Sequence, residues 1–153
     1  MWERNGVKFK HIRSSRAATF QVVCVDTAAV ASADTDVLAG AFFPNTGPAE
    51  SRTLRIYPAA LAENHIKYMA NILAHELGHI LGLRHEFTDR NEPRSLRWGK
   101  ANSNSVMNYH AKLKRYQVQK QDLVDLKSFY SSDKAKHRGW RIRTFDPPAH
   151  VYG

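Results

Sequence analysis

The segment from residue 75 to residue 85 constrains the fold most, because its histidines stand at the spacing of a metal site built on a helix. His75 and His79 are four residues apart, so on an α-helix they lie one turn apart and point in the same direction. Both imidazoles can therefore bind one zinc ion. Glu76 follows the first histidine and can act on a metal-bound water without becoming a ligand itself. The spacing predicts a helix that carries part of a catalytic metal site.

A glycine and a third histidine extend this motif. Gly82 can adopt the left-handed backbone conformation that ends a helix, and the turn can bring His85 to the same metal. Three protein ligands leave a position open for water, which is typical of catalytic zinc, whereas structural sites have four ligands. The alternative is an amphipathic helix with surface histidines. The helix does have an apolar stripe, which indicates that it packs in the core. The stripe does not compete with metal binding, because its residues differ from the histidines and Glu76: Ile72, Leu73, Leu77, Ile80 and Leu81.

A methionine-containing turn follows at a characteristic distance. Residues 105–109 read Ser-Val-Met-Asn-Tyr and lie about twenty residues after His85. The histidine motif followed by such a turn resembles the metzincins, a clan of zinc endopeptidases. The resemblance implies that Met107 forms an apolar floor beneath the histidines; alone, it would be interpreted as an ordinary core methionine. It also implies an α/β (α+β) catalytic domain, with a twisted mixed sheet and the active-site helix above a zinc cleft, and an irregular C-terminal subdomain with a closing helix.

Two families within the clan are similar to this chain. The astacins have a tyrosine two residues after the methionine, which matches Tyr109, and a glutamate after the third histidine, which matches Glu86. The chain departs from them at Asn108, where they have histidine, and at Leu83, where they have phenylalanine. The resemblance implies that Tyr109 can exchange between zinc ligation and the reaction intermediate. The alternative for Tyr109 is a buried or half-buried tyrosine with a satisfied hydroxyl.

The matrixins share a different segment. Residues 38–44 read Leu-Ala-Gly-Ala-Phe-Phe-Pro, which is similar to the Leu-Ala-His-Ala-Phe stretch at the edge of the matrixin sheet, beside the substrate. A peptide lying along such an edge would add main-chain hydrogen bonds. The edge is either residues 38–43 or residues 52–57, and the sequence does not decide between them.

The function that this resemblance implies is hydrolysis of peptide bonds in a protein or peptide substrate. One catalytic Zn²⁺ would be held by His75, His79 and His85, with Glu76 as general base and Tyr109 as a possible switch ligand. One rival hypothesis is a catalytically silent, zinc-containing binding module that uses the cleft or a basic face. A second rival is a metallohydrolase that acts on another bond.

Length and charge favour one catalytic domain, residues 1–131, followed by a basic tail, residues 132–153. The chain has 153 residues and a net charge of +9, of which residues 111–153 contribute +6. The basic surface could bind polyanions, although a solvated face is the simpler interpretation and no nucleic-acid motif is present. No apolar run is long enough to span a membrane, and no signal peptide is visible. The resemblance implies a secreted protein, and we expect a monomer.

Periodicity predicts the secondary structure along the chain. Strands are expected at residues 6–12, 20–25, 37–43 and 52–57, and a helix over residues 59–81 that ends at Gly82. A loop over residues 84–104 and a closing helical element over residues 116–130, with the helix entry at residues 119–122, follow. In the tail, Trp140 could hold the segment against the body of the domain. The single cysteine, Cys24, excludes an intramolecular disulfide, and we expect it to be a small core residue of an interior strand. A regulatory free thiol is the alternative.

Overall fold

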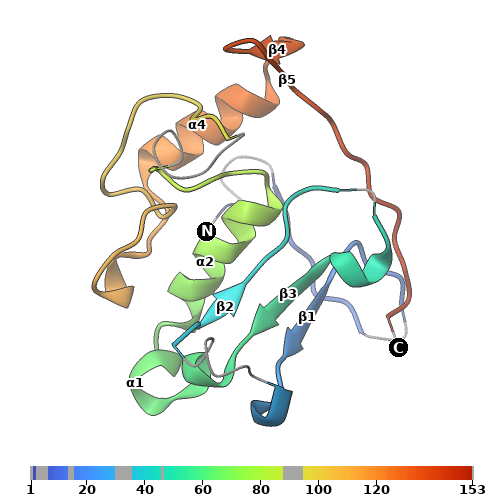
Figure 1. Ribbon diagram of the computed structural model, residues 1–153, viewed down its shortest axis with the longest axis vertical. Helices are drawn as coiled ribbons and strands as arrows, with labels where there is room; N and C mark the ends of the chain where they lie inside the picture. Colours follow the sequence, from blue (N-terminus) through green and yellow to red (C-terminus); the bar gives the residue numbers. More distant parts are fainter. Residues whose placement is uncertain are drawn as a thin grey trace.

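The computed structural model describes residues 2, 7–13, 16–29, 36–45, 47–87 and 95–152, and these form a mixed α/β fold (Figure 1). The fold class is therefore as predicted. Three strands, β1 (Gln21–Cys24), β2 (Ala39–Gly40) and β3 (Thr53–Ile56), form one sheet. The helices are α1 (Glu63–Ile66), α2 (Met69–Ile80) and α4 (Lys120–Tyr130). A small hairpin of β4 (Lys136–His137) and β5 (Trp140–Arg141) follows α4. Among the described helices, none has the length and apolar character needed to cross a membrane.

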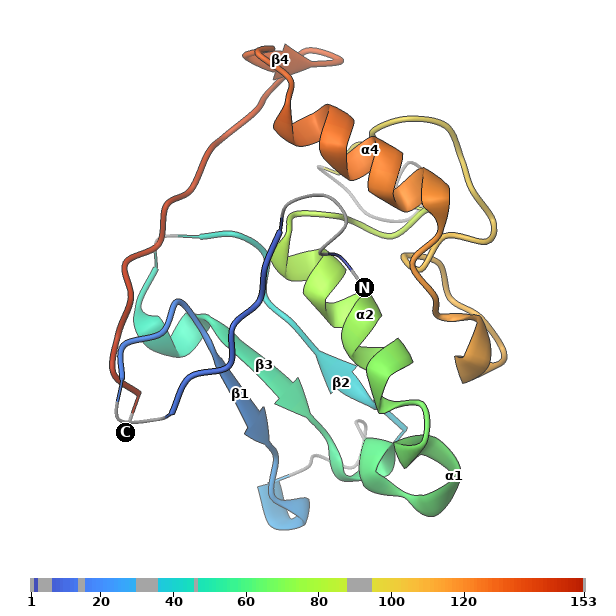
Figure 2. The same cartoon turned by 180° about the vertical axis from the view of Figure 1, so that it is seen from behind.

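The sheet has the strand order β1-β3-β2, with β1 parallel and β2 antiparallel to the central strand. The prediction of a strand at residues 52–57 is confirmed, because β3 buries Leu54 and Ile56 and exposes Arg55, the alternation expected when one face is covered. Helix α2 covers that face: Leu54 and Ile56 form one core cluster with Ala60 and Ile72 of the helical region. Seen from behind, α2 runs beside β2 in roughly the same direction as the strands (Figure 2).

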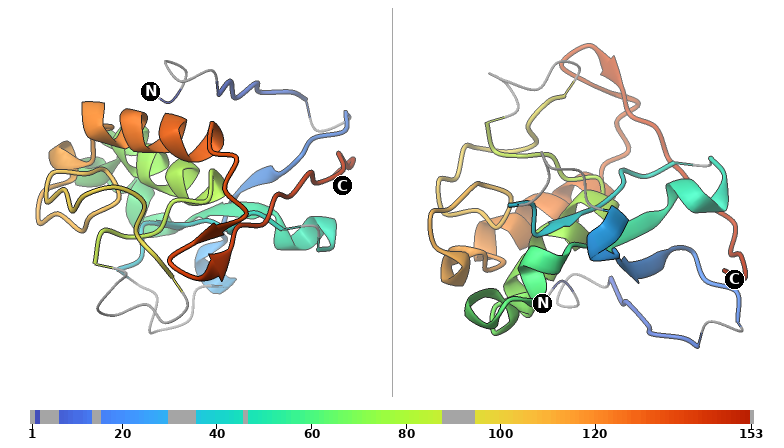
Figure 3. Two further views of the ribbon diagram at one scale, coloured as in Figure 1. Left: turned by 90° about the horizontal axis from the view of Figure 1, so that it is seen from above. Right: turned by 60° about the horizontal axis from the view of Figure 1, so that its bottom comes forward.

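A second core lies on the other side of α2. It joins Trp2, Ala74 and Leu81 to Val106, Met107 and Leu126, so α2 is packed between the sheet and α4 (Figure 3). The closing helix predicted within residues 116–130 is confirmed as α4, which begins at the predicted entry, residues 119–122. Its start is a capping box, in which the Gln119 backbone N–H donates to Asp122 Oδ2 at 2.7 Å. The same oxygen accepts the Val106 N–H at 3.1 Å, which ties α4 to the methionine turn.

The helix predicted over residues 59–81 is broken into pieces. A 3₁₀ turn at Pro58–Leu61 and the short α1 precede α2, which begins at Met69. Pro58 fixes the backbone at the start of the first turn, and apolar spacing alone did not reveal the breaks. The predicted end is confirmed: Gly82 has a φ of 91°, the Leu83 N–H donates to the Gly78 carbonyl at 3.0 Å, and the Gly82 N–H donates to the His79 carbonyl at 2.9 Å. This pair of bonds is a Schellman C-cap.

The expectations for the first strands are wrong in two places. Residues 7–13 form no strand; the alternation there reflects Val7 and Phe9, which pack against the core, while Gly6 lies outside the described residues. The segment at residues 20–25 is an edge strand and not an interior one, with Val22 54% exposed and Cys24 exposed. Cys24 is therefore not a core residue. A short apolar run does not specify whether both faces of its strand are covered.

The C-terminal segment returns to the sheet. The Ile142 N–H donates to the Ala135 carbonyl at 2.9 Å, and His150 forms an antiparallel bridge with Ala18. In Figures 1 and 2 the segment after the β4–β5 hairpin runs down one side of the molecule toward β1. Trp140 is 53% exposed, so it does not anchor the segment as expected; instead His137 packs on Trp98, with ring centroids 4.7 Å apart. The domain boundary at residue 131 remains a prediction.

A buried arginine holds the far end of this segment. Arg52 is 0% exposed and donates to three backbone carbonyls, those of Thr19 at 3.0 Å, Gly47 at 2.6 Å and Pro148 at 3.1 Å. Because a buried cation is stable only when its donors are satisfied, this side chain needs all three segments to be in place.

Candidate metal centre

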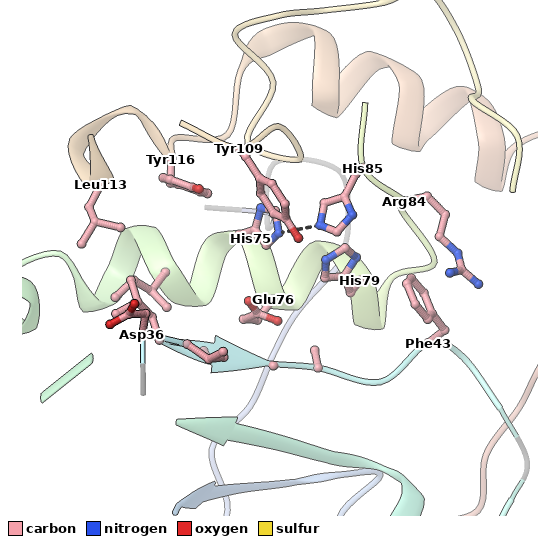
Figure 4. Close-up of a pocket in the computed structure, with 16 residues that line it drawn as sticks. Asp36, Phe43, His75, Glu76, His79, Arg84, His85, Tyr109, Leu113 and Tyr116 are labelled. Carbon is pink, nitrogen blue, oxygen red and sulfur yellow. Dashed lines mark hydrogen bonds between the residues drawn. The ribbon is translucent and has the colours of Figure 1, made fainter. Parts of the chain in front are cut away.

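The structure brings the three predicted ligands together. His75 and His79 lie on α2 and His85 lies beyond the Gly82 turn, and one ligand atom from each falls within 4.8 Å of the others. The Nε2 atoms of His75 and His85 are 3.3 Å apart. Two tetrahedral ligands at about 2.0–2.1 Å from zinc would lie roughly 3.3–3.4 Å apart, so this separation fits the ion. In Figure 4 the three rings converge on one point above α2.

Backbone carbonyls orient two of these rings. His75 Nδ1 lies 2.7 Å from the Val106 carbonyl, and His79 Nδ1 lies 2.9 Å from the Leu83 carbonyl. A carbonyl accepts only from a protonated nitrogen, so each contact favours the tautomer whose Nε2 can bind a metal. Burial lowers the pKa of His75 to about 4, and the nearby His85 adds to this effect. His75 is therefore neutral near pH 7, which is the form that binds zinc.

Glu76 is buried beside the histidines and lines the same cleft. Burial raises the pKa of its carboxyl to about 7, and the Ala41 backbone N–H, which donates to the carboxylate, partly opposes this effect. A carboxyl whose pKa lies near neutral pH can both accept and return a proton. The contact with Ala41 also places Glu76 next to the segment that forms the wall of the cleft.

Met107 is buried against α2. A Cβ built at Gly78 would overlap Met107 Sδ, and would lie 3.2 Å from Met107 Cε and 3.3 Å from Trp2 Cζ2. Only glycine lets the methionine turn approach the helix this closely between His75 and His79. The sequence interpretation missed Gly78 and Trp2; a glycine inside a strongly helical segment was the available signal. Trp2 also donates its indole N–H to the Ala74 carbonyl at 3.0 Å.

Tyr109 lies beside the metal centre and is 64% exposed, so the alternative of a buried or half-buried tyrosine is wrong. Its ring centroid is 4.6 Å from that of His85 and 6.0 Å from that of His75. In Figure 4 its hydroxyl points toward the histidines. The sequence interpretation also missed Phe87, which stacks on His85 at 4.8 Å and 12° and contacts Tyr109 at 5.1 Å.

Glu86 stands apart from the metal cluster. Its Oε2 accepts the Asn102 N–H at 2.9 Å, and its own N–H donates to the Met107 carbonyl at 3.2 Å. Burial raises the pKa of its carboxyl. Glu86 therefore connects the loop after His85 to the methionine turn.

The cleft beside the histidines has a volume of about 550 Å³. Residues 36–43, which include β2, form one wall, and Tyr109, Leu113 and Tyr116 form the other. Because β3 is central and paired on both sides, residues 52–57 cannot receive an added strand. Of the two edges considered from the sequence, only the one at residues 38–43 faces the cleft.

Comparison with known families agrees with this geometry. Residues 58–133 match a protein-family model, DUF4953, described as Met-zincin. The match supports a metzincin-type domain. It covers the histidine motif, the methionine turn and α4, and the family implies zinc as the metal. No curated protein and no solved structure matches the chain. The finer assignments to an astacin-like or matrixin-like branch remain predictions.

Proposed function

We propose that this chain is a zinc-dependent endopeptidase. The observation that supports the proposal best is the position of a buried carboxylate, Glu76, beside three converging imidazoles in a cleft whose wall is a sheet edge. His75, His79 and His85 would hold the ion. When bound, zinc supplies a Lewis acid that polarises a water molecule and the substrate carbonyl.

Side chains and backbone groups of the chain would transfer the proton, stabilise the developing charge and bind the substrate. Glu76 takes a proton from the attacking water at its carboxylate and returns it to the leaving amine. Tyr109, whose side chain is exposed beside His85, donates a hydrogen bond to the negative charge that develops on the carbonyl oxygen. The substrate lies extended along β2, where backbone groups of the sheet edge bind it regardless of its sequence. By resemblance to the metzincins, we expect the protein to act outside the cell.

The test compares the zinc-loaded protein with its Glu76→Gln variant on an unfolded protein substrate. We expect the variant to bind zinc in the same ratio and to lose at least about 10²-fold in kcat, the typical contribution of a general base. Zinc content is measured by atomic absorption and cleavage by mass spectrometry of the fragments. A zinc-loaded wild-type protein that cleaves no peptide bond would instead favour the binding module, and an active Glu76→Gln variant would remove Glu76 from the mechanism.

A further inference from the structure

The hairpin that follows α4 projects from the molecule. β4 and β5 pair in antiparallel order, with Lys136 opposite Arg141 and His137 opposite Trp140. The two turn residues, at positions 138 and 139, have φ of 45° and 85°, and a type I′ turn requires positive values at both. Figures 1 and 2 show the hairpin beyond α4, at one end of the longest axis of the molecule. None of its residues lines the cleft, so the metal centre does not account for it.

An aromatic contact holds this hairpin on the domain. The His137 ring packs on Trp98, with centroids 4.7 Å apart, and His137 Nε2 lies 3.1 Å from the Arg97 carbonyl oxygen. Trp98 in turn packs on Phe129 of α4, with centroids 5.2 Å apart. Because side chains alternate along a strand, Lys136 projects on the opposite face from His137. The hairpin therefore has an inner face, which packs on Trp98, and an outer face, which includes Lys136.

The outer face of the hairpin carries cations side by side. Residues 134–143 contain five Lys or Arg and no Asp or Glu. Lys136 and Arg141 are exposed and stand directly opposite each other across the two strands, where like charges are destabilising. Arg143 extends the same face, because the ladder continues by one more hydrogen bond, of 2.9 Å, beyond Arg141. Within the described part of the chain, no carboxylate pairs with these three side chains. A negatively charged partner would remove the repulsion between them.

Trp140 adds an apolar group to this charged tip. Its side chain is 53% exposed, although indole side chains are on average highly buried in folded proteins. Indole rings are enriched at the boundary between lipid and water, where they lie at the level of the head groups. A nucleic-acid strand would instead require a groove that follows its backbone and several stacking platforms, whereas the hairpin is a projecting tip with one exposed indole (Figure 1). An indole beside cations on such a tip fits a flat anionic surface with an apolar layer beneath it.

We propose that the β4–β5 hairpin docks on membrane surfaces that are rich in anionic lipids. Lys136, Arg141 and Arg143 lie at the phosphate groups, and Trp140 places its ring among the head groups. One cation near such a surface strengthens binding about fivefold, so the three together contribute about 10²-fold. Salt screens this attraction, so binding weakens as the salt concentration rises. The proposal goes beyond the proposed endopeptidase function and does not depend on it.

The test measures how the zinc-loaded protein partitions into sedimented vesicles. One set of vesicles is phosphatidylcholine alone, and the other contains an equal amount of phosphatidylglycerol. We expect binding to the anionic vesicles only, and the triple variant Lys136→Gln, Arg141→Gln, Arg143→Gln should bind them about 10²-fold more weakly. A matched control variant should stay close to the wild-type affinity. It removes the same charge at three exposed positions outside the hairpin: Arg55→Gln, Lys112→Gln and Lys114→Gln.

Fluorescence tests the position of Trp140. Lipids with brominated acyl chains quench an indole that reaches the bilayer. Anionic vesicles that contain them should quench the wild-type protein and leave Trp140→Phe unquenched, because the remaining tryptophans, Trp2 and Trp98, pack against the domain. Urea unfolding midpoints equal to that of the wild type verify that the variants fold. The salt dependence of wild-type binding needs no variant.

Several outcomes would each overturn the proposal. They are equal partition into neutral and anionic vesicles, wild-type binding that salt does not weaken, a control variant that loses as much affinity as the hairpin variant, and quenching that persists in Trp140→Phe. Heparin or single-stranded RNA that binds through the hairpin cations, when anionic vesicles do not, would also overturn it. Because no step measures cleavage, these outcomes are independent of whether the protein hydrolyses peptide bonds.

Discussion

The close approach of the methionine turn to α2 predicts that Gly78→Ala is destabilising. In an ordinary helix this change stabilises by about 1 kcal/mol, because alanine has the higher helix propensity. Here the new Cβ would overlap Met107 Sδ and lie 3.3 Å from Trp2 Cζ2, and Met107 and Trp2 are 2% and 1% exposed. Because both side chains are buried in the core, a shift of either one disturbs its packing, and an overpacking cost of about 1–3 kcal/mol applies. The net loss should be about 0–2 kcal/mol after the propensity gain of about 1 kcal/mol is subtracted.

Urea unfolding followed by circular dichroism, at a fixed zinc concentration, measures this loss. Ala70→Gly, at an exposed position of α2, is the control for helix propensity and should cost about 0.5–1 kcal/mol. Met107→Ala removes the overlapping atoms, so the double variant with Gly78→Ala should be more stable than the sum of the two single changes by at least about 1 kcal/mol. A Gly78→Ala protein that is more stable than wild type would refute the packing argument.

Three further changes test other parts of the structure. Asp122→Ala removes the acceptor shared by the Val106 and Gln119 N–H groups. We expect the free energy of unfolding in urea to fall by about 2–4 kcal/mol, and zinc to bind more weakly in competition with a chelator. An unchanged zinc affinity would contradict the link between Asp122 and the metal centre. Tyr109→Phe should lower kcat with stability within about 0.5 kcal/mol of wild type, because the side chain is exposed; an unchanged kcat would exclude the hydroxyl from the reaction. Arg52→Ala leaves three carbonyls without their donor and should make the segment around Pro148 sensitive to proteolysis under native conditions, which peptide mapping would detect.

The sequence predicted the metal centre more completely than the sheet. Helical spacing places His75 and His79 on one face, and the requirement for a positive φ identifies Gly82 as the turn, so local chemistry was sufficient for these residues. His85 depends on that turn, and its position followed once the turn was recognised.

The sheet depends on contacts between distant segments, which local patterns do not contain. The run around Val22 is apolar enough for an interior strand, yet among the described strands it pairs with β3 alone and leaves Val22 and Cys24 exposed. Similarly, the glycine at position 78 signals a close approach to the helix, but it does not say that the approaching side chain is Met107, 29 positions further along the chain. Residues whose roles arise from tertiary packing were therefore the ones missed.

The two bonds of the Asp122 carboxylate make the start of α4 and the first histidine parts of one cooperative unit. Asp122 accepts from Gln119 at the beginning of α4 and from Val106 in the methionine turn, and the Val106 carbonyl contacts His75 Nδ1. By linkage, an ion that restrains His75 also restrains the first turn of α4, and the effect is reciprocal. Amide hydrogens at the beginning of α4 should then exchange more slowly with solvent when zinc is bound, so this helix would report occupancy of a site that it does not touch.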